Sequence, residues 1–193
     1  MVKVGVLALQ GDFAEHINAM RLLGTDTLEV KHAVEFDEID ALVIPGGEST
    51  TMARLLDLND MRQPLVGYAE EGMPIWGTCA GMILMSSSVS DGRPEPLHLI
   101  DMKVSRNAFG RQVDSFEALI DLPVIGGNKF HAVFIRAPIV DDIKEPAKVI
   151  GRLDDNTIVA VRQDSLLATA FHPELTEDYR LHQYFLEFVQ KTQ

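Results

Sequence analysis

The lone cysteine of the chain, Cys79, has the surroundings of a nucleophile. It lies in Gly77-Thr78-Cys79-Ala80-Gly81, a G-x-nucleophile-x-G pattern with Cys in place of Ser. A nucleophile at the tip of a strand-to-helix turn has strained backbone geometry, and the flanking glycines let neighbouring chain pass close to it. The first N–H groups of the following helix then stabilise a thiolate and an oxyanion. The pattern favours a catalytic cysteine over an inert buried thiol, the usual fate of a free cysteine.

A cysteine nucleophile needs a base and a group that orients the base, and His172 with Glu174 fits both roles. His172 ends the apolar stretch LLATAF and precedes Pro173 and Glu174. Proline holds the chain extended, so these side chains project from the carboxyl end of a strand, where α/β sheets place their sites. The alternative is a polar turn before a helix. With the cysteine elbow present, we predict a Cys79-His172-Glu174 triad.

The other histidines are weaker candidates for the base. His16 and His182 fall on predicted helices, and His32 and His98 fall within strand patterns. In both settings a satisfied or solvent-facing imidazole is the more common outcome. His131 remains a second candidate.

A glycine-rich loop, Pro45-Gly46-Gly47-Glu48-Ser49, follows another apolar stretch. It could be a simple turn in which Ser49 caps a helix. In the functional interpretation, the unhindered N–H of Gly47 and that of Ala80 form a two-donor oxyanion hole. Neither this loop nor the cysteine turn fits a nucleotide phosphate-binding motif.

These residues require a sheet whose strand ends meet at one edge. Residues 1–88 alternate short apolar strands with helical patterns, which predicts parallel strands covered on both faces. Asp12 and Glu15 form a plausible helix-capping pair. The predicted strands are 2–9, 28–34, 41–45 and 74–77, and the predicted helices are 12–23, 48–56, 62–71 and 80–88.

From about residue 98 the pattern changes to short strands separated by turn signals, which predicts an antiparallel extension. A helix over about 177–190 has its apolar residues on one side and should pack on the sheet. With no repeat or linker, we predict a single α/β domain over residues 1–193. The strands predicted in this half are 98–105, 112–120, 129–138, 147–153, 157–163 and 166–172.

Composition excludes several classes of protein. The net charge of −12 argues against binding to a nucleic-acid backbone, which needs clustered Lys and Arg. No apolar run reaches the roughly 18 residues of a membrane span. One cysteine excludes an internal disulfide framework, and no secretory leader opens the chain, so we expect a cytoplasmic protein.

The whole pattern resembles class I glutamine amidotransferase domains and, within them, the glutaminase subunits of ribose 5-phosphate-dependent pyridoxal 5′-phosphate synthases. The elbow alone would fit many amidotransferases, whereas LALQGD, GGESTT and RNAFGRQ are specific to this family. The segments that carry the resemblance are GVLALQGDFAEH at 5–16, PGGESTT at 45–51, GTCAGMILM at 77–85, RNAFGRQVDSFE at 106–117, FIRAP at 134–138 and FHPELTEDYRLH at 171–182.

The resemblance implies a three-layer sandwich with a mostly parallel central sheet, helices on both faces and an antiparallel extension. It implies the same triad, with no metal and no cofactor. It also implies that a separate synthase subunit uses the ammonia to make vitamin B6 from ribose 5-phosphate and glyceraldehyde 3-phosphate, and that Gln10 lies at the interface with this subunit. The residues it places against glutamine are Gly47, Glu48, Ser49, Arg106, Ile135 and Arg136.

Three alternatives stay open at this point. A cysteine peptidase or deglycase on a similar sheet generally has a His close after the Cys, and residues 80–91 contain none. A glutaminase could also serve another pathway, such as histidine or tryptophan synthesis. A non-catalytic binding subunit that keeps the fold is the third alternative.

Overall fold

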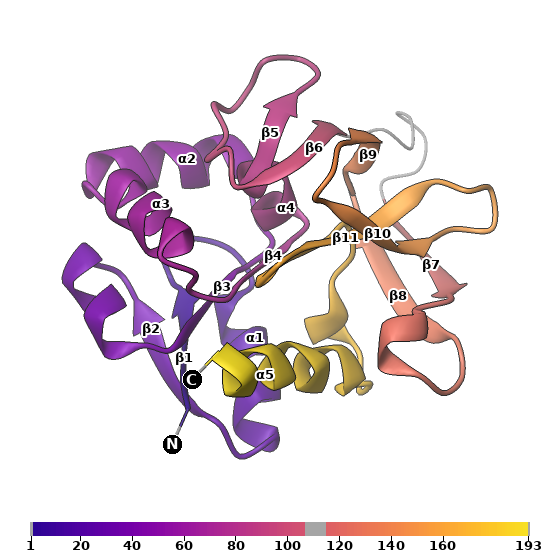
Figure 1. Ribbon diagram of the computed structural model, residues 1–193, viewed down its shortest axis with the longest axis horizontal. Coiled ribbons are helices and arrows are strands. Elements are labelled where there is room, and N and C mark those ends of the chain that lie inside the picture. Colours follow the sequence, from indigo (N-terminus) through magenta and orange to yellow (C-terminus); the bar gives the residue numbers. More distant parts are fainter. Residues whose placement is uncertain (1, 107–114, 193) are drawn as a thin grey trace.

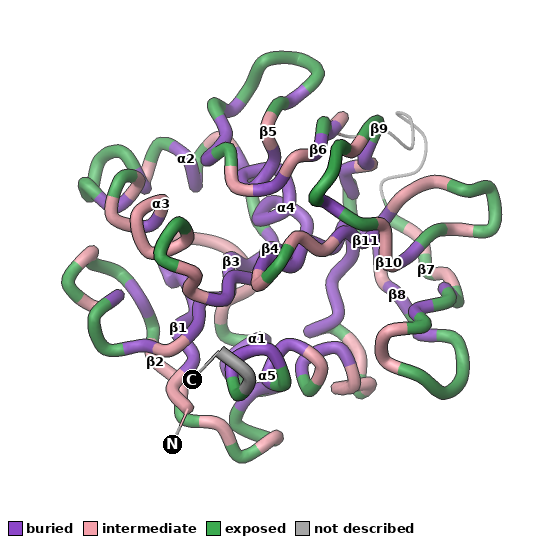
Figure 2. Tube along the Cα trace, viewed as in Figure 1, coloured by how far each residue is buried: buried purple, intermediate pink, exposed green. Residues whose placement is uncertain are grey.

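The computed structural model describes residues 2–106 and 115–192, and a ten-stranded sheet forms its centre. Five strands run parallel in the order β2-β1-β3-β4-β12. β1, β3, β4 and β12 are short apolar segments, buried along most of their length because helices cover both faces, whereas the edge strand β2 is buried only at Val30 (Figure 2). Their bounds are β1 Lys3–Leu7, β2 Asp26–Val30, β3 Ala41–Ile44, β4 Ile75–Thr78 and β12 Leu166–Thr169.

Helices cover this sheet in two layers (Figure 1). α1 (Phe13–Leu22) and α5 (Arg180–Thr192) lie on one face. α2 (Ser49–Leu58), α3 (Arg62–Glu70) and α4 (Ala80–Met85) lie on the other. The predicted three-layer α/β architecture is therefore confirmed.

The predicted antiparallel extension is also confirmed. β12 pairs antiparallel with β11, which pairs in the same sense with β9 and β10. Beyond β9 lie β6, antiparallel to β9, and β5, which is parallel to β6 and forms the far edge, while β7 and β8 form a separate two-stranded sheet. The bounds are β5 Ser86–Val89, β6 Ile100–Ser105, β7 Ser115–Ile120, β8 Phe130–Ile135, β9 Ile139–Ile143, β10 Lys148–Arg152 and β11 Ile158–Gln163.

The second predicted strand is too long. β2 ends at Val30, and Ala33–Glu38 forms a 3-10 helix, η1, in place of further strand. The carboxylate of Glu35 accepts hydrogen bonds from the N–H groups of Lys31 and His32, at 2.6 and 2.8 Å. This cap turns the chain out of the sheet.

Other boundaries also differ from the sequence prediction. α4 ends at Met85 rather than near residue 88, because the Ser86 hydroxyl donates to the Ile83 carbonyl at 2.8 Å and the chain continues as β5. Strand β9 was not predicted, and the final helix begins at Arg180 rather than near 177. Two further 3-10 helices are η2 (Pro123–Ile125) and η3 (Pro173–Leu175).

Within residues 2–106 and 115–192, no helix is both long enough and apolar enough to cross a membrane.

Candidate active site

The elbow around Cys79 has the strand-turn-helix form that the sequence predicts. Cys79 joins β4 to α4 with φ 48° and ψ −100°, a conformation that L residues rarely adopt. Its N–H donates to the Thr169 carbonyl of β12 at 2.8 Å, which ties the turn to the neighbouring strand. This hydrogen bond to the sheet therefore helps to hold Cys79 in its strained backbone conformation.

The flanking glycines are required by close backbone approach. A Cβ on Gly77 would lie 2.5 Å from the carbonyl carbon of Gly81, and one on Gly81 would lie 2.2 Å from the Ile44 carbonyl oxygen. Backbone atoms cannot move aside as a flexible side chain can. The crossing of α4 over β3 therefore leaves no room for a side chain at either position.

The imidazole of His172 lies beside this elbow because β12 is the parallel neighbour of β4. Its Nδ1 lies 2.7 Å from Oε1 of Glu174, and both side chains are buried. Burial alone would lower the pKa of His172, but hydrogen bonds with Cys79 and Glu174 outweigh it and raise the pKa to about 10. The arrangement therefore favours an imidazolium at His172, beside Cys79 and Glu174.

Glu174 is the more buried of the two acids beside His172. Burial raises its pKa, and the hydrogen bond with His172 acts in the opposite direction. The Asp12 carboxylate adds a second negative charge nearby, since its Oδ2 lies 3.5 Å from Nδ1 of His172. Asp12 makes no side-chain cap on α1, so the predicted capping pair with Glu15 is wrong.

Asp12, His172 and Glu174 each offer one possible metal-ligand atom, and these atoms lie within 4.8 Å of one another. The Nδ1 atom of His172 is engaged by Glu174 at 2.7 Å, however. A proton on that nitrogen leaves no lone pair there for a metal ion. The cluster is therefore better suited to orienting the imidazole.

The glycine-rich loop after β3 contacts the side chain of Gln10. The Glu48 N–H donates to Oε1 of Gln10 at 2.9 Å, and a Cβ on Gly47 would lie 2.6 Å from the same oxygen. The Gly46 carbonyl accepts from the Asp12 N–H at 3.0 Å. The turn after β1 and the predicted oxyanion loop are thus bonded to each other.

Glu48 caps α2, and Ser49 is the first helical residue. The alternative in which Ser49 is the N-cap is therefore wrong. The Glu48 carboxylate accepts from the N–H groups of Thr50 and Thr51. Burial would raise the pKa of Glu48, but hydrogen bonds from the side chains and then the N–H groups of Thr50 and Thr51 lower it to about 2, so the side chain is an anion at neutral pH.

The remaining predicted glutamine contacts lie in two places. The Ile135 carbonyl, at the end of β8, is 3.7 Å from Sγ of Cys79, and Arg136 follows with φ 45°. Arg106, at the end of β6, forms an ion pair with Asp91 in the loop after β5. The structure thus brings Ile135 to the nucleophile, whereas the described polar contacts of Arg106 point to the far edge of the sheet. The RNAFGRQ motif lies mostly outside the described residues.

The other histidines fall into two groups. His131 lies on the exposed face of β8 and pairs with Glu117 at 2.7 Å, which removes it as a second candidate for the base. His16 and His182 are instead fully buried. The sequence carried a signal for this burial, because His16 shares a helix face with Ile17 and Met20, and His182 lies beside Leu181 and Phe185.

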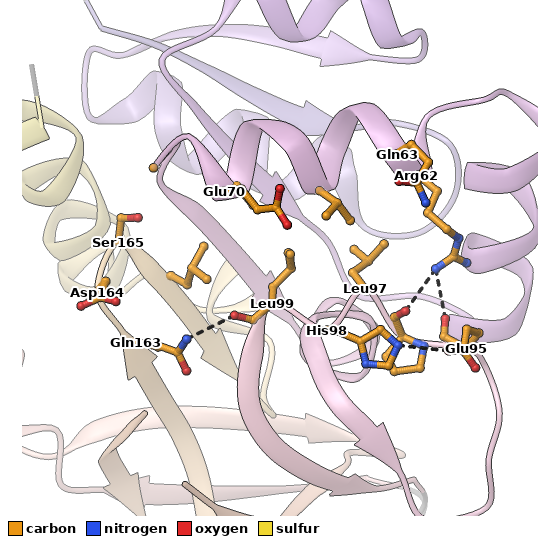
Figure 3. A pocket seen from close by; sticks show the side chains of 15 residues that line it. Arg62, Gln63, Glu70, Glu95, Leu97, His98, Leu99, Gln163, Asp164 and Ser165 are labelled. Carbon is orange, nitrogen blue, oxygen red and sulfur yellow. Dashed lines mark hydrogen bonds and ion pairs between the residues drawn. The ribbon is translucent and has the colours of Figure 1, made fainter. Parts of the chain in front are cut away.

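A cavity of about 610 Å³ lies where β4 and β12 begin, at the amino-terminal ends of these strands (Figure 3). Its cationic group is already bound, since Arg62 donates to the carbonyls of Glu95 and Pro96 at 3.2 and 3.3 Å. His98 likewise pairs with Glu95 at 3.0 Å. The length of the strands separates this cavity from Cys79. Cys79 and His172 lie at the opposite, carboxyl-terminal ends of β4 and β12.

Comparison with known proteins adds an independent line of support. The SNO glutamine amidotransferase family matches residues 6–191. A protein of Herpetosiphon aurantiacus named pyridoxal 5′-phosphate synthase subunit PdxT is 54% identical, with 95% of this chain and 98% of that protein covered. The protein of the same name in Moorella thermoacetica is 48% identical, with 97% and 100% covered.

Solved structures agree with these relatives. A crystal structure described as a glutamine amidotransferase superposes with a TM-score of 0.91 at 44% identity, covering 97% of this chain and 98% of the other. A Thermoplasma acidophilum protein described as part of a putative GMP synthase, at 19% identity and a TM-score of 0.72 with 100% and 96% covered, shares the fold alone. The chain therefore belongs to the SNO glutamine amidotransferase family.

Proposed function

We propose that this protein hydrolyses glutamine to glutamate and ammonia and delivers the ammonia to a synthase subunit that makes pyridoxal 5′-phosphate from ribose 5-phosphate and glyceraldehyde 3-phosphate. The observation that carries the proposal is the buried His172–Glu174 pair, 2.7 Å apart, beside a strained cysteine elbow. Relatives named as subunits of pyridoxal 5′-phosphate synthase support the second half. Their names favour this pathway over histidine or tryptophan synthesis.

In the proposed mechanism, the Cys79 thiolate attacks the side-chain amide carbon of glutamine. The carbonyl oxygen gains negative charge, which the N–H groups of Gly47 and Ala80 accommodate. His172 is held by Glu174 through Nδ1, which leaves its other nitrogen to donate a proton to departing ammonia. No external oxidant, metal or cofactor takes part in these steps.

The second half of the reaction releases glutamate. The neutral imidazole of His172 removes a proton from water, which attacks the thioester carbon, and the C–S bond breaks to restore the thiolate. Glu174 stabilises the imidazolium that forms at each stage. One imidazole therefore serves as acid and then as base.

Glutamine itself would be bound by Gly47, Glu48, Ser49, Arg106, Ile135 and Arg136. An Arg fork suits the substrate α-carboxylate, and a carboxylate suits its ammonium, so Arg106 and Glu48 are the proposed discriminating residues. Glu48 is anionic, as this role requires, although its carboxylate also caps α2.

Gln10 is the proposed link to the synthase subunit. Its amide holds the loop of Gly47 through the Glu48 N–H, so movement of Gln10 on docking would alter the oxyanion hole. Such coupling limits wasteful hydrolysis by the isolated chain. The proposed setting for this complex is the cytoplasm.

Glutamate release with and without the synthase subunit tests both halves. We expect the wild-type rate to rise on addition of synthase, and Cys79→Ala to reduce the stimulated rate by at least about a thousandfold, since the nucleophile acts as a unit with its base. The sole cysteine makes the substitution unambiguous. Undiminished hydrolysis by Cys79→Ala would refute the nucleophile. A wild-type rate unaffected by synthase would refute the coupling.

A further inference from the structure

A buried pair of histidines lies directly behind the triad. Nε2 of His16, on α1, is 3.3 Å from Oε2 of Glu174 and 3.2 Å from the Thr78 hydroxyl. Nδ1 of His16 is 3.3 Å from Nε2 of His182, on α5. Both histidines have no exposed surface, so water cannot supply alternative partners. The contacts link α5 and α1 to the carboxylate that orients His172.

The unsatisfied polar atoms of the interior mark the two ends of this chain of contacts. Among the described residues, the buried side-chain N and O atoms without a hydrogen bond are Oε2 of Glu174 and Nδ1 of His182. His16 Nε2 lies 3.3 Å from Glu174 Oε2, but the pair does not have the geometry of a hydrogen bond. A small rotation of either side chain would satisfy the carboxylate oxygen, which costs free energy while it is unpaired.

The distances select one tautomer of His16. A neutral imidazole carries one N–H, and a lone pair on Nε2 facing an anionic oxygen at 3.3 Å would be repulsive. With the proton on Nε2, His16 faces two acceptors, the Thr78 hydroxyl at 3.2 Å and the Glu174 carboxylate at 3.3 Å, and its Nδ1 accepts from the N–H of His182. The unpartnered Nδ1 of His182 is then a lone pair and not a buried N–H.

We propose that His16, held in this tautomer by His182, is a positioning residue that keeps Glu174 ionised and oriented toward His172. This role rests on the proposed function, because it acts through the triad. His16 touches neither the sulfur nor the place of the substrate. Its contribution is a donor on the side of the carboxylate that His172 does not reach.

The charges around Glu174 show why such a donor is needed. His172 faces it from the same segment and is hydrogen-bonded to it at 2.7 Å. Asp12, before α1, raises the pKa of Glu174 further, as does burial. Burial, followed by the nearby His182 and His172, lowers the pKa of His16 well below its usual value, so His16 stays neutral and keeps a single directed proton.

The surroundings also fix both rings in place. Trp76 packs edge-on against His16 and His182, with ring centroids 5.6 and 4.9 Å away. Its indole N–H donates to the Thr169 hydroxyl at 3.2 Å, so the tryptophan is anchored to β12. Both imidazoles are therefore restricted to rotamers that keep the chain of contacts.

The first test compares His16→Leu with His16→Gln in the presence of the synthase subunit. The Leu variant removes the donor, whereas a Gln amide can still present an N–H toward Glu174. We expect kcat of the Leu variant to fall about tenfold at unchanged KM, and the acid limb of its pH profile to move up by about one to two units, the effect of losing one hydrogen bond to a carboxylate. The Gln variant should keep the wild-type limb. An unmoved limb in the Leu variant would overturn the proposal.

A double-mutant cycle separates positioning from general structure. In a Glu174→Gln background, His16→Leu should cause little further loss, because the partner no longer carries a charge. An equal loss in both backgrounds would mean that His16 acts elsewhere, and the proposal would fail. Cys79→Ala should abolish hydrolysis whether or not His16 is present. If Cys79→Ala remained active, the proposed function would fail, and this result is distinct from a failure of the role of His16.

The final test needs no variant and no glutamine. Nitrogen-15 NMR of histidine-labelled wild-type chain distinguishes the two imidazole tautomers. We expect His16 to carry its proton on Nε2, and His182 to do the same. A proton on Nδ1 of His16 would overturn the assignment, even if the Leu variant failed to fold.

Discussion

At the scale of single residues, the charge of His172 depends on two neighbours that lie on different sides of it. Cys79 comes from the end of the neighbouring parallel strand, and Glu174 comes from the turn that follows His172. Each contributes a hydrogen bond that favours the imidazolium against the cost of burial. Loss of either neighbour should therefore change the titration of the ring.

Nitrogen-15 NMR should show His172 protonated at neutral pH, with a midpoint near the pKa of about 10 that the structure indicates. Because both neighbours raise this pKa, Cys79→Ala and Glu174→Gln should each lower the midpoint. Because folding raises the pKa of His172, protonation of this residue stabilises the folded state. This contribution to folding stability is complete below pH about 6.5, the pKa of histidine in the unfolded chain, and is lost as the pH rises toward 10. Glu117→Gln, which alters the partner of exposed His131, serves as the control. An unchanged midpoint in both triad variants would contradict the assigned contacts.

The sequence could point to the proposed triad residues but not to the residues packed behind them. Cys79 and His172 are recognisable because glycines and a proline impose unusual backbone on the chain beside them. His16 and His182 lie on apolar helix faces, which indicates burial, but only the packing of α1 against α5 decides that the two imidazoles contact each other. Such a tertiary contact leaves no local pattern.

At the scale of elements, the elbow is held by the crossing of α4 over β3. This crossing brings Gly81 against the carbonyl of Ile44, at the end of the strand that leads into the Gly47 loop. The nucleophile and the proposed oxyanion donors are thus set at a fixed separation by two backbones in contact.

Gly81→Ala should destabilise the protein by about 3 kcal/mol, because its Cβ would lie 2.2 Å from the Ile44 carbonyl oxygen and overpack the crossing. Urea denaturation followed by circular dichroism measures the change. Gly67→Ala in α3 is the matched control, since nothing lies within 4 Å of its added Cβ. Helix propensity predicts a gain of about 0.5–1 kcal/mol there. Equal effects at the two glycines would contradict the close approach.

Element boundaries were predictable where apolar runs end at glycine or proline, and less so where a side chain turns the chain. The bonds from Glu35 convert the expected end of β2 into a 3-10 helix. β9 escaped prediction because Asp141 and Asp142 interrupt its apolar pattern, although its backbone pairs with β6 and β11. In these cases pairing or capping outweighed residue type.

At the scale of the whole molecule, the order of strands concentrates the site. β3, β4 and β12 are adjacent, and each leads to one part: the Gly47 loop, the proposed nucleophile Cys79 and the proposed base His172. The sequence predicted a parallel half and an antiparallel half, but not that β12 lies between β4 and β11. That position follows from the pairing of segments distant in sequence. The extent of the domain, residues 1–193, stays a prediction.

Because these strands lie within one buried apolar cluster, the site should lose its structure only when the whole protein unfolds. Trp76, the sole tryptophan, is fully buried and bonded to Thr169, so its fluorescence reports on packing beside the triad. On heating, we expect the fluorescence transition to coincide with the loss of far-ultraviolet circular dichroism. An earlier fluorescence change would indicate that the site opens independently of the sheet.

The insertion of β12 beside β4 also has a consequence for synthesis of the protein. Trp76 and Thr169 are hydrogen-bonded although they lie 93 residues apart in sequence. A nascent chain that has just exposed the elbow on the ribosome therefore has its thiol but not yet its base. The contact forms only after almost the entire polypeptide has emerged. A translation product interrupted before His172 would lack the proposed base, so we expect it to release no ammonia.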